Sequence, residues 1–308
     1  MAAPTDRPLD GLAVSVAGPG RVGASLARWA AAAGATVRRV GSRVLRPSAL
    51  ALAEELSAEP VELASLSTAG DDLLLVAVAD PALPEVAESL ARRPQAAVVL
   101  HTSGSRGAAV LAPLAAGGSA VGSLHPLVAF PRPLPDPLSA RGAAFAVDGD
   151  PAARAMAGRL AAAWGAAAIE VPAEARDLYH LAATLAAGGV TTLLATATSI
   201  ARSAGLPDRV AAGYLELARG ALAAAGEELA AGRGLAGAIT GPAARGDAET
   251  VRRHLAALAR ERPELVPLVV RLARETLARL AESGPEGAER RALGEVLDAS
   301  ASLSRPPS

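Results

Sequence analysis

The chain has 308 residues, which is enough for two domains with complete hydrophobic cores. A formal net charge of -1 gives no electrostatic reason to expect binding to nucleic acid or to a membrane. Cysteine is absent, which excludes a disulfide framework and a thiolate zinc site, and we predict no metal centre. Lysine is absent too, so no lysine can act as a general acid. The N-terminus lacks the pattern of a secretory signal, and we expect a cytoplasmic protein.

The first apolar run, Leu12–Ala17, predicts a buried strand, and a helical pattern opens soon after it. Between them, glycines fall at the first, third and sixth positions of Gly18-Pro-Gly-Arg-Val-Gly23. The first glycine permits a tight turn, the second lets the backbone approach a pyrophosphate, and the third lets the helix pack closely on the strand. The amides of the first helical turn then face the phosphates. The loop therefore predicts a dinucleotide site whose contacts are Gly18, Gly20, Arg21, Val22 and Gly23.

The end of the second predicted strand, Thr36–Val40, indicates which dinucleotide binds. Proteins that bind NAD usually place a carboxylate there to hold the ribose hydroxyls. This chain has Gly41, Ser42 and Arg43 instead, and an arginine can pair with the 2′-phosphate of NADP. We therefore predict NADP(H) as the cofactor, with Ser42 and Arg43 in contact with it. The alternative is that Arg43 is a solvated loop residue.

Strands and helices go on alternating up to Val171, which predicts an α/β fold with a doubly wound, parallel sheet. The further predicted strands are 61–63, 73–78, 97–100, 120–124, 143–147 and 167–171. Several polar residues follow these strands directly, and ligands bind at that edge of an open α/β sheet. We predict that Asp80, His101 and Ser103 contact the cofactor, while His125 lies close to them.

The chain from Ala173 onward is purely helical in pattern, with predicted helices at 173–204, 207–231, 247–260, 263–283 and 286–303. We therefore expect a Rossmann-type domain over residues 1–171 and an all-α domain over 172–308. The uncharged stretch Leu181–Ile200 is long enough to span a bilayer, but its glycines and threonines favour a helix buried inside protein. Its small residues also permit close helix approach, and we expect a homodimer formed through the helical domain.

A proton donor near a reacting carbonyl is best supplied by histidine, because the pKa of its side chain lies near neutral pH. The chain has four histidines. We expect His254 at the surface and favour His125 and His180 as proton donor or substrate holder. The alternative for His101, His125 and His180 is a hydrogen-bonded structural role.

Arg245 is a candidate for binding a substrate carboxylate with two hydrogen bonds, or else it pairs with Asp247. Thr240 and Asp247 are further substrate candidates. Asp247 is also a plausible helix N-cap, and Thr240 could merely satisfy a turn.

These motifs together resemble a known family. The chain is similar, over nearly its whole length, to Rossmann-like proteins that carry a C-terminal helical domain of unknown function, family 2520. The motifs that carry the likeness are the Gly18–Gly23 loop, His101-Thr-Ser-Gly104, Ser123-Leu-His-Pro126 with Phe130, Leu178-Tyr-His180, and Thr240-Gly-Pro242 with Arg245-Gly-Asp247. The chain departs from its relatives at Gly188-Gly189, where they often have Ser-Asn.

The resemblance implies a plan shared with β-hydroxyacid dehydrogenases, pyrroline-5-carboxylate reductases and ketopantoate reductases. It implies an NADPH-dependent reductase of a small keto acid, with 2-dehydropantoate as the expected substrate. Two alternatives remain open: an imine reductase of the pyrroline-5-carboxylate type, and a regulatory protein that binds NADP without catalysis. Ketopantoate reductases use a lysine as the acid, and this chain has none.

Overall fold

A computed structural model describes residues 7–282 and 287–301. The chain forms two compact units, which divide between Ala187 and Gly188. Contacts of Arg176 and Tyr179 with the sheet keep the helix α6 (Arg176–Thr184) in the first unit. This division therefore falls after the boundary between residues 171 and 172 that the sequence predicts, and that domain boundary stays a prediction. The predicted tail 304–308 lies outside the described residues.

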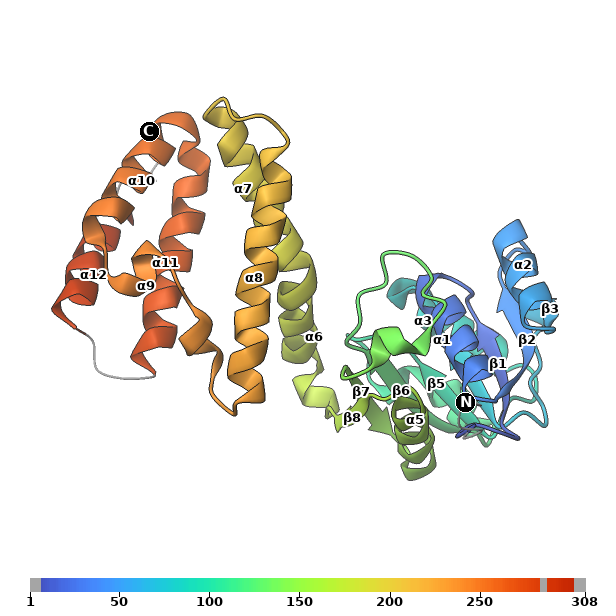
Figure 1. Cartoon of the computed structure of the whole chain (residues 1–308). Coiled ribbons are helices and arrows are strands. Elements are labelled where there is room, and N and C mark those ends of the chain that lie inside the picture. Colours follow the sequence, from blue (N-terminus) through green and yellow to red (C-terminus); the bar gives the residue numbers. More distant parts are fainter. Residues whose placement is uncertain (1–6, 283–286, 302–308) are drawn as a thin grey trace, which may run out of the picture. The chain divides into compact units, whose positions relative to one another are not determined.

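The first unit is built on an eight-stranded sheet with the order β3-β2-β1-β4-β5-β6-β7-β8 (Figure 1). The α/β, Rossmann-type class predicted from the sequence is confirmed. The strands are β1 (Ala13–Ala17), β2 (Thr36–Ser42), β3 (Glu59–Glu62), β4 (Leu73–Val76), β5 (Val98–His101), β6 (Ala120–Pro126), β7 (Ala144–Gly149) and β8 (Ala167–Glu170).

One strand pair departs from the fully parallel sheet that we expected. The pairs from β3 across to β6 are parallel, and so is β7 with β8, but β6 and β7 run antiparallel. A parallel neighbour needs a crossover, usually through a helix, and the chain has none between these two strands. It returns instead through the proline-containing segment 127–143, which holds only one turn of 3₁₀-helix.

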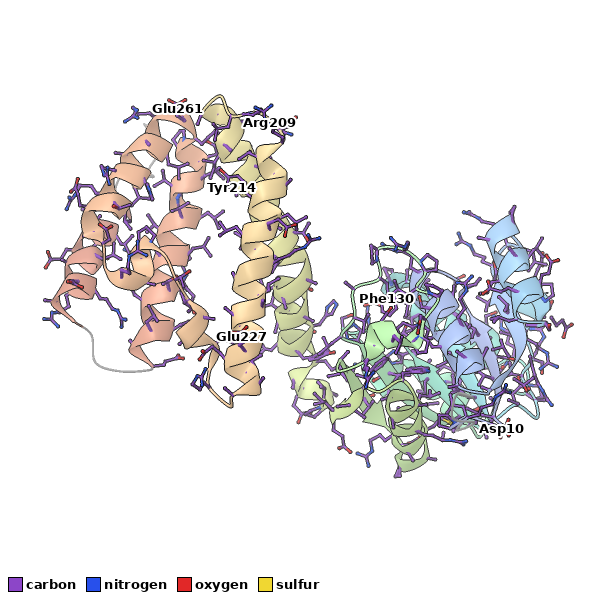
Figure 2. All side chains as sticks on the ribbon, viewed as in Figure 1. Asp10, Phe130, Arg209, Tyr214, Glu227 and Glu261 are labelled. Atoms are coloured by element: carbon purple, nitrogen blue, oxygen red, sulfur yellow. The ribbon has the colours of Figure 1, made fainter. Side chains whose placement is uncertain are left out.

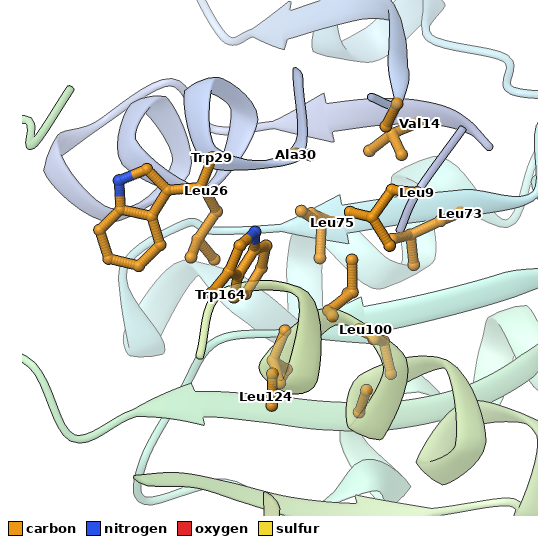
Figure 3. Packing of buried hydrophobic residues seen from close by; sticks show 14 of the residues in the cluster. Leu9, Val14, Leu26, Trp29, Ala30, Leu73, Leu75, Leu100, Leu124 and Trp164 are labelled. Carbon is orange, nitrogen blue, oxygen red and sulfur yellow. The ribbon is translucent and has the colours of Figure 1, made fainter. Parts of the chain in front are cut away.

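The strands bury both faces, as parallel sheets do. In β4, Leu73 and Leu75 belong to one core cluster, while Leu74 and Val76 belong to another, because successive side chains point to opposite faces. The larger cluster contains Trp29 and Trp164, whose rings meet edge to face with centroids 5.6 Å apart (Figure 3). Two layers of side chains therefore hold the sheet rigid, so that its carboxyl edge can position a site.

The helices of the first unit flank this sheet and include one that the sequence analysis missed, α2, which has Pro47 as its first residue. The sequence of residues 106–116 is helical in pattern, but it forms an α-helix only over its last five residues, because a 3₁₀ turn at Ala108–Leu111 precedes them. Besides α6, the helices are α1 (Arg21–Ala32), α2 (Pro47–Glu55), α3 (Leu83–Leu90), α4 (Ala112–Ala116) and α5 (Pro151–Ala163).

The second unit is helical, as predicted. It comprises α7 (Val190–Ser203), α8 (Val210–Ala230), α9 (Pro242–Arg245), α10 (Ala248–Glu261), α11 (Val266–Ala281) and α12 (Ala288–Ala301). Its core is formed by apolar residues of α10, α11 and α12, among them Leu255, Val270 and Leu293. A long helical run, Ala173–Ser203, continues from α6 through a π-helical turn at Leu185–Gly189 into α7.

The prediction that residues 181–200 form a buried helix is wrong for the single chain, because none of these residues is buried. The run Ala173–Ser203 is long and apolar enough to cross a membrane, with a mean hydropathy of 1.4 in its most apolar window. Apolar length indicates that a segment favours burial, but it does not say which element will cover it. The expectation that this helix does not span a membrane stays a prediction.

Candidate functional site

The glycine loop between β1 and α1 has the geometry that its sequence predicts. Gly18 has a positive φ of +93°, and a Cβ there would lie 2.7 Å from the carbonyl oxygen of Ala77. A Cβ at Gly23 would lie 2.1 Å from the carbonyl oxygen of Gly18. Gly20 differs, since a Cβ there would meet nothing within 4 Å. Gly18 and Gly23 thus close the turn, while Gly20 borders open space at the start of α1, where helix amides favour an anion.

A cavity of about 370 Å³ extends from this loop along the carboxyl ends of β1, β2 and β4. Its apolar wall includes Leu63, Val78 and Val86. Arg43 and Arg46 line its polar side, and both are exposed and without an ion-pair partner among the described residues. The arrangement combines an apolar surface with two free guanidinium groups, which suits a ligand that has a ring and a phosphate.

Ser42 and Arg43, both predicted from the sequence, line this cavity together with Arg46, which was not predicted. Ser42 lines the same cavity, although its hydroxyl donates to the carbonyl oxygen of Val44. Arg46 lies immediately before α2, the helix that was also missed. Its position three residues after Arg43 was the feature of the sequence that could have indicated a second phosphate-binding candidate.

A second group of side chains lies where β6 meets α6. The Nδ1 atom of His125 lies 2.6 Å from the hydroxyl oxygen of Tyr179. The ring of His180 stands nearly perpendicular to that of His125, with centroids 5.9 Å apart. The structure thus brings together the two histidines that the sequence favoured for catalysis, and it adds Tyr179, which the sequence analysis gave no role.

Burial is the main influence on the ionisation of this group. It lowers the pKa of His125 to about 4, and the nearby His180 and the Arg176 guanidinium act in the same direction. It raises the pKa of the Tyr179 hydroxyl to about 12. Both side chains are therefore uncharged at neutral pH, so His125 can donate a hydrogen bond there but is not an imidazolium.

Two cavities meet at these histidines. One, of about 310 Å³, lies beside Arg21, Asp80 and Gly104; the other, of about 390 Å³, extends along α6 to Thr184 and Ala187. The residues that line both are His125, Pro126, Val128 and His180. Phe130, labelled in Figure 2, lines the first and packs against Trp29 with ring centroids 5.7 Å apart. The first unit therefore has room for a small molecule directly against His125 and His180.

Gly104 lines the smaller of these two cavities and lies very close to the rings of His125 and His180. A Cβ at Gly104 would lie 2.6 Å from Cδ2 of His180 and 2.7 Å from Nε2 of His125. Only a residue without a side chain allows the backbone to approach both rings so closely.

The loop that carries Gly104 is held by His101 and Ser103. His101 is fully buried, its Nδ1 accepts from the Ser103 amide at 3.2 Å, and its Nε2 therefore donates to the Gly107 carbonyl oxygen at 3.2 Å. Burial lowers the pKa of His101 to about 4. The Ser103 hydroxyl accepts from the Arg106 amide. These contacts shape the loop; contact of either residue with the cofactor stays a prediction.

Asp80 lines the cavity beside Arg21, as expected for a residue at the end of β4. Its carboxylate accepts a hydrogen bond of 2.7 Å from the Ser105 hydroxyl. The loop after β4 and the loop after β5 are therefore tied together at the sheet edge.

A buried arginine, which was not predicted from the sequence, lies near His125. Arg176, the first residue of α6, is only 2% exposed and pairs with the carboxylate of Asp148 on β7 at 3.2 Å. It also donates to the hydroxyl of Ser123 on β6 and to the carbonyl oxygen of Ser103. Arg176 thus joins α6 to two strands and to the Gly104 loop. No local pattern marks it, because its partners lie far away in the sequence.

The remaining predicted residues belong to the second unit. Asp247 is the N-cap of α10 and accepts from the Thr250 amide at 3.0 Å, so the predicted cap is confirmed. That hydrogen bond lowers the pKa of its carboxyl. Arg245 and Thr240 are exposed, and Arg245 has no ion-pair partner among the described residues. His254 is exposed, as expected. Contact of Thr240, Arg245 or Asp247 with a substrate stays a prediction.

Family models match the chain in two segments. Residues 5–126 match a Rossmann-like domain, and residues 143–276 match a domain of unknown function, DUF2520. The chain is a Rossmann-like protein with a DUF2520 domain. No curated protein matches it. The histidine pair with Tyr179 thus combines a residue of the Rossmann-like segment with two residues of the DUF2520 segment.

Solved structures share this fold. A protein assigned as an NADP oxidoreductase from Bacteroides fragilis is 23% identical, with a TM-score of 0.69 over 87% of this chain and 98% of that one. An imine reductase from Myxococcus stipitatus in complex with NADP+ is 18% identical, with a TM-score of 0.57 over 92% and 99%. A pyrroline-5-carboxylate reductase from Coxiella burnetii is 13% identical, with a TM-score of 0.56 over 95% and 98%.

Proposed function

We propose that this protein is an NADPH-dependent reductase of a small molecule with a carbonyl or imine group. The observation that carries the proposal is the cavity between the Gly18–Gly23 loop and the two free arginines. The amides at the start of α1 would hold the pyrophosphate, while Arg43 and Arg46 would hold the 2′-phosphate. The fold neighbours named for NADP support the same cofactor. When bound, NADPH supplies the hydride.

The side chains at the second group of cavities would then orient and polarise the substrate. His125 and His180 border both spaces, and a hydrogen bond from either to the reacting oxygen or nitrogen would stabilise charge that develops there. Phe130 and Val128 add apolar wall, which excludes water from the reacting group. Binding of the substrate by Arg245, Thr240 and Asp247 stays a separate prediction, because these residues belong to the second unit.

Two substrate classes fit. The first is a keto acid, with 2-dehydropantoate as the compound suggested by the family resemblance. The second is a cyclic imine such as pyrroline-5-carboxylate, which the imine and pyrroline-5-carboxylate reductases among the fold neighbours favour. A regulatory protein that binds NADP without turnover is the outcome if neither compound is reduced.

The test has two parts. Calorimetry should show tighter binding of NADPH than of NADH, and Arg43→Ala should weaken NADPH by about tenfold or more while leaving NADH unchanged. NADPH oxidation is then measured with each substrate class separately. Absence of NADPH binding would remove the whole proposal, whereas binding without oxidation would leave the regulatory alternative.

We further propose a cytoplasmic homodimer formed through the long helices. Leucines on α6 and α8 stand well exposed in the single chain, among them Leu178 (74%), Leu217 (73%) and Leu229 (60%). Large apolar side chains that stand exposed in the single chain favour an interaction site. Light scattering of the purified protein should give twice the chain mass of 30.6 kDa, and a monomer would contradict the proposal.

A further inference from the structure

Tyr179 is the one side chain of the histidine group that the proposed function does not use. Its hydroxyl lies 2.6 Å from Nδ1 of His125, a short hydrogen bond between α6 and β6. The two rings meet edge to face, with an interplanar angle of 89° and centroids 5.6 Å apart. Nδ1 of the imidazole is therefore hydrogen-bonded to the protein. Whether Nδ1 carries the ring proton decides whether Nε2 is a hydrogen-bond donor or an acceptor.

The direction of this hydrogen bond follows from the chemistry of the two groups. A neutral phenol is a stronger acid than a neutral imidazole N–H, and a bare imidazole nitrogen is a stronger acceptor than a phenolic oxygen. The Tyr179 O–H therefore donates to Nδ1, and the ring proton of His125 is carried by Nε2.

The Nε2 atom faces the cavity wall at Gly104. A Cβ on that residue would lie 2.7 Å from Nε2, and Gly104 and His125 line the same cavity. The charged or titratable groups that act on His125 are Arg176 and His180 from α6, Asp80 after β4, and His101 on β5. Among the described residues, none of these four groups is hydrogen-bonded to the imidazole, whereas Tyr179 is, so Tyr179 sets the proton position.

We propose that Tyr179 is a positioning residue, which holds His125 in the Nε2–H form so that this atom donates a hydrogen bond to the reacting oxygen or nitrogen of the substrate. The role in reduction rests on the proposed function. The tautomer itself does not, because it is a property of the free protein. No proton needs to leave His125 for this role, since a fixed donor aimed at the developing charge is sufficient.

The tautomer is measured directly by 15N NMR on protein labelled only at histidine. The chain has four histidines, and His125→Gln identifies the His125 signals by their loss. At pH 7 we expect an unprotonated, pyridine-like Nδ1 and a protonated, pyrrole-like Nε2 for His125. In Tyr179→Phe the two nitrogens should shift toward averaged values as both tautomers become populated.

His101 is the internal control. Its Nδ1 accepts from the Ser103 amide and its Nε2 donates to Gly107, so its signals should show the same tautomer and stay unchanged in Tyr179→Phe. A protonated Nδ1 on His125 in the unmodified protein, or unchanged His125 signals in Tyr179→Phe, would overturn the proposal.

Turnover provides the second readout. With a substrate from the keto acid or imine panel, Tyr179→Phe should lower kcat by about tenfold and leave the NADPH dissociation constant unchanged. An unchanged kcat would remove the catalytic half of the proposal. If the NMR result is as expected but no panel compound is reduced by the unmodified protein, the tautomer assignment stands and the proposed function fails.

Discussion

Gly104→Ala tests whether His125 and His180 act together at a reacting group. The substitution adds a single methyl group at the wall where both rings are closest to the backbone. Gly104 does not have a positive φ, so alanine is compatible with the backbone there. The methyl carbon would lie 2.6 Å from Cδ2 of His180 and 2.7 Å from Nε2 of His125.

The size of the effect follows from these distances. An ordinary contact between such atoms is about 3.5 Å, so the rings must retreat by about 1 Å. A misplacement of about 1 Å in a catalytic group can cost about 100-fold in rate. We therefore expect a kcat about 100-fold lower. The change in NADPH affinity should be much smaller, because Gly104 is not among the residues that line the Arg43 cavity.

The assay is NADPH oxidation with the best compound of the substrate panel, together with calorimetric titration of NADPH. Gly158→Ala is the matched control, because a Cβ on that residue of α5 would meet nothing within 4 Å. Full turnover in Gly104→Ala would refute the role of the histidine pair, since the methyl group cannot be accommodated without moving a ring. Complete loss of NADPH binding in Gly104→Ala would contradict the placement of the NADPH phosphates in the Arg43 cavity, which Gly104 does not line.

Three further predictions concern stability and the glycine loop, and Trp29 and Trp164, the chain's two tryptophans, report by fluorescence on unfolding of the first unit. Asp148→Asn leaves the buried Arg176 without its counter-charge and should lower the free energy of unfolding by about 3 kcal/mol. Glu170→Gln, which removes the exposed pair with Arg154 in the same unit, should not move the urea midpoint; equal midpoints for the two variants would contradict this. Burial lowers the pKa of His101 to about 4 in the folded state, against 6.5 in the unfolded chain, and His125 is shifted in the same way. The unfolded chain therefore binds protons first, and the free energy of unfolding should fall as the pH drops from 6.5 to 4. A urea midpoint at pH 5 equal to that at pH 7 would rule this out. Gly20→Ala should weaken NADPH binding at least tenfold without changing the urea midpoint, and tight NADPH binding by this variant would argue against a pyrophosphate at the loop. Gly23→Ala should weaken NADPH binding too and should also destabilise the first unit by about 1–3 kcal/mol.

Much of the site could be read from local pattern. The Gly18–Gly23 loop was recognisable because its three glycines fall at fixed spacing between a strand run and a helix pattern that are adjacent in the sequence. Asp80, His101 and His125 were placed at one sheet edge because they directly follow apolar runs, and parallel strands bring their carboxyl ends together. Asp80 and His125 do line one cavity at that edge. The buried His101 does not line it, and both of its ring nitrogens are hydrogen-bonded to its own loop.

Other parts could not be read in this way. Arg176 pairs with Asp148, and Tyr179 bonds to His125 across 54 positions of sequence, so no periodicity could reveal either contact. The antiparallel pairing of β6 with β7 was missed because a strand's apolar pattern is the same in either direction. The helix over 181–200 was expected to be buried inside protein because it is uncharged and contains glycines and threonines. Its burial depends on a neighbouring element, and composition does not show which element that is.

The sequence by itself therefore determined the strands, the helical second half and the glycine-rich turn after β1, because strand runs, helix periods and glycine turns are set by residues adjacent along the chain. Only the tertiary structure decided which polar groups touch. It brought His125 into contact with Tyr179 and His180, paired the buried Arg176 with Asp148, and placed Gly104 against both histidine rings. These contacts depend on long-range packing, in which the partner of a side chain is chosen by the fold and not by its sequence neighbours.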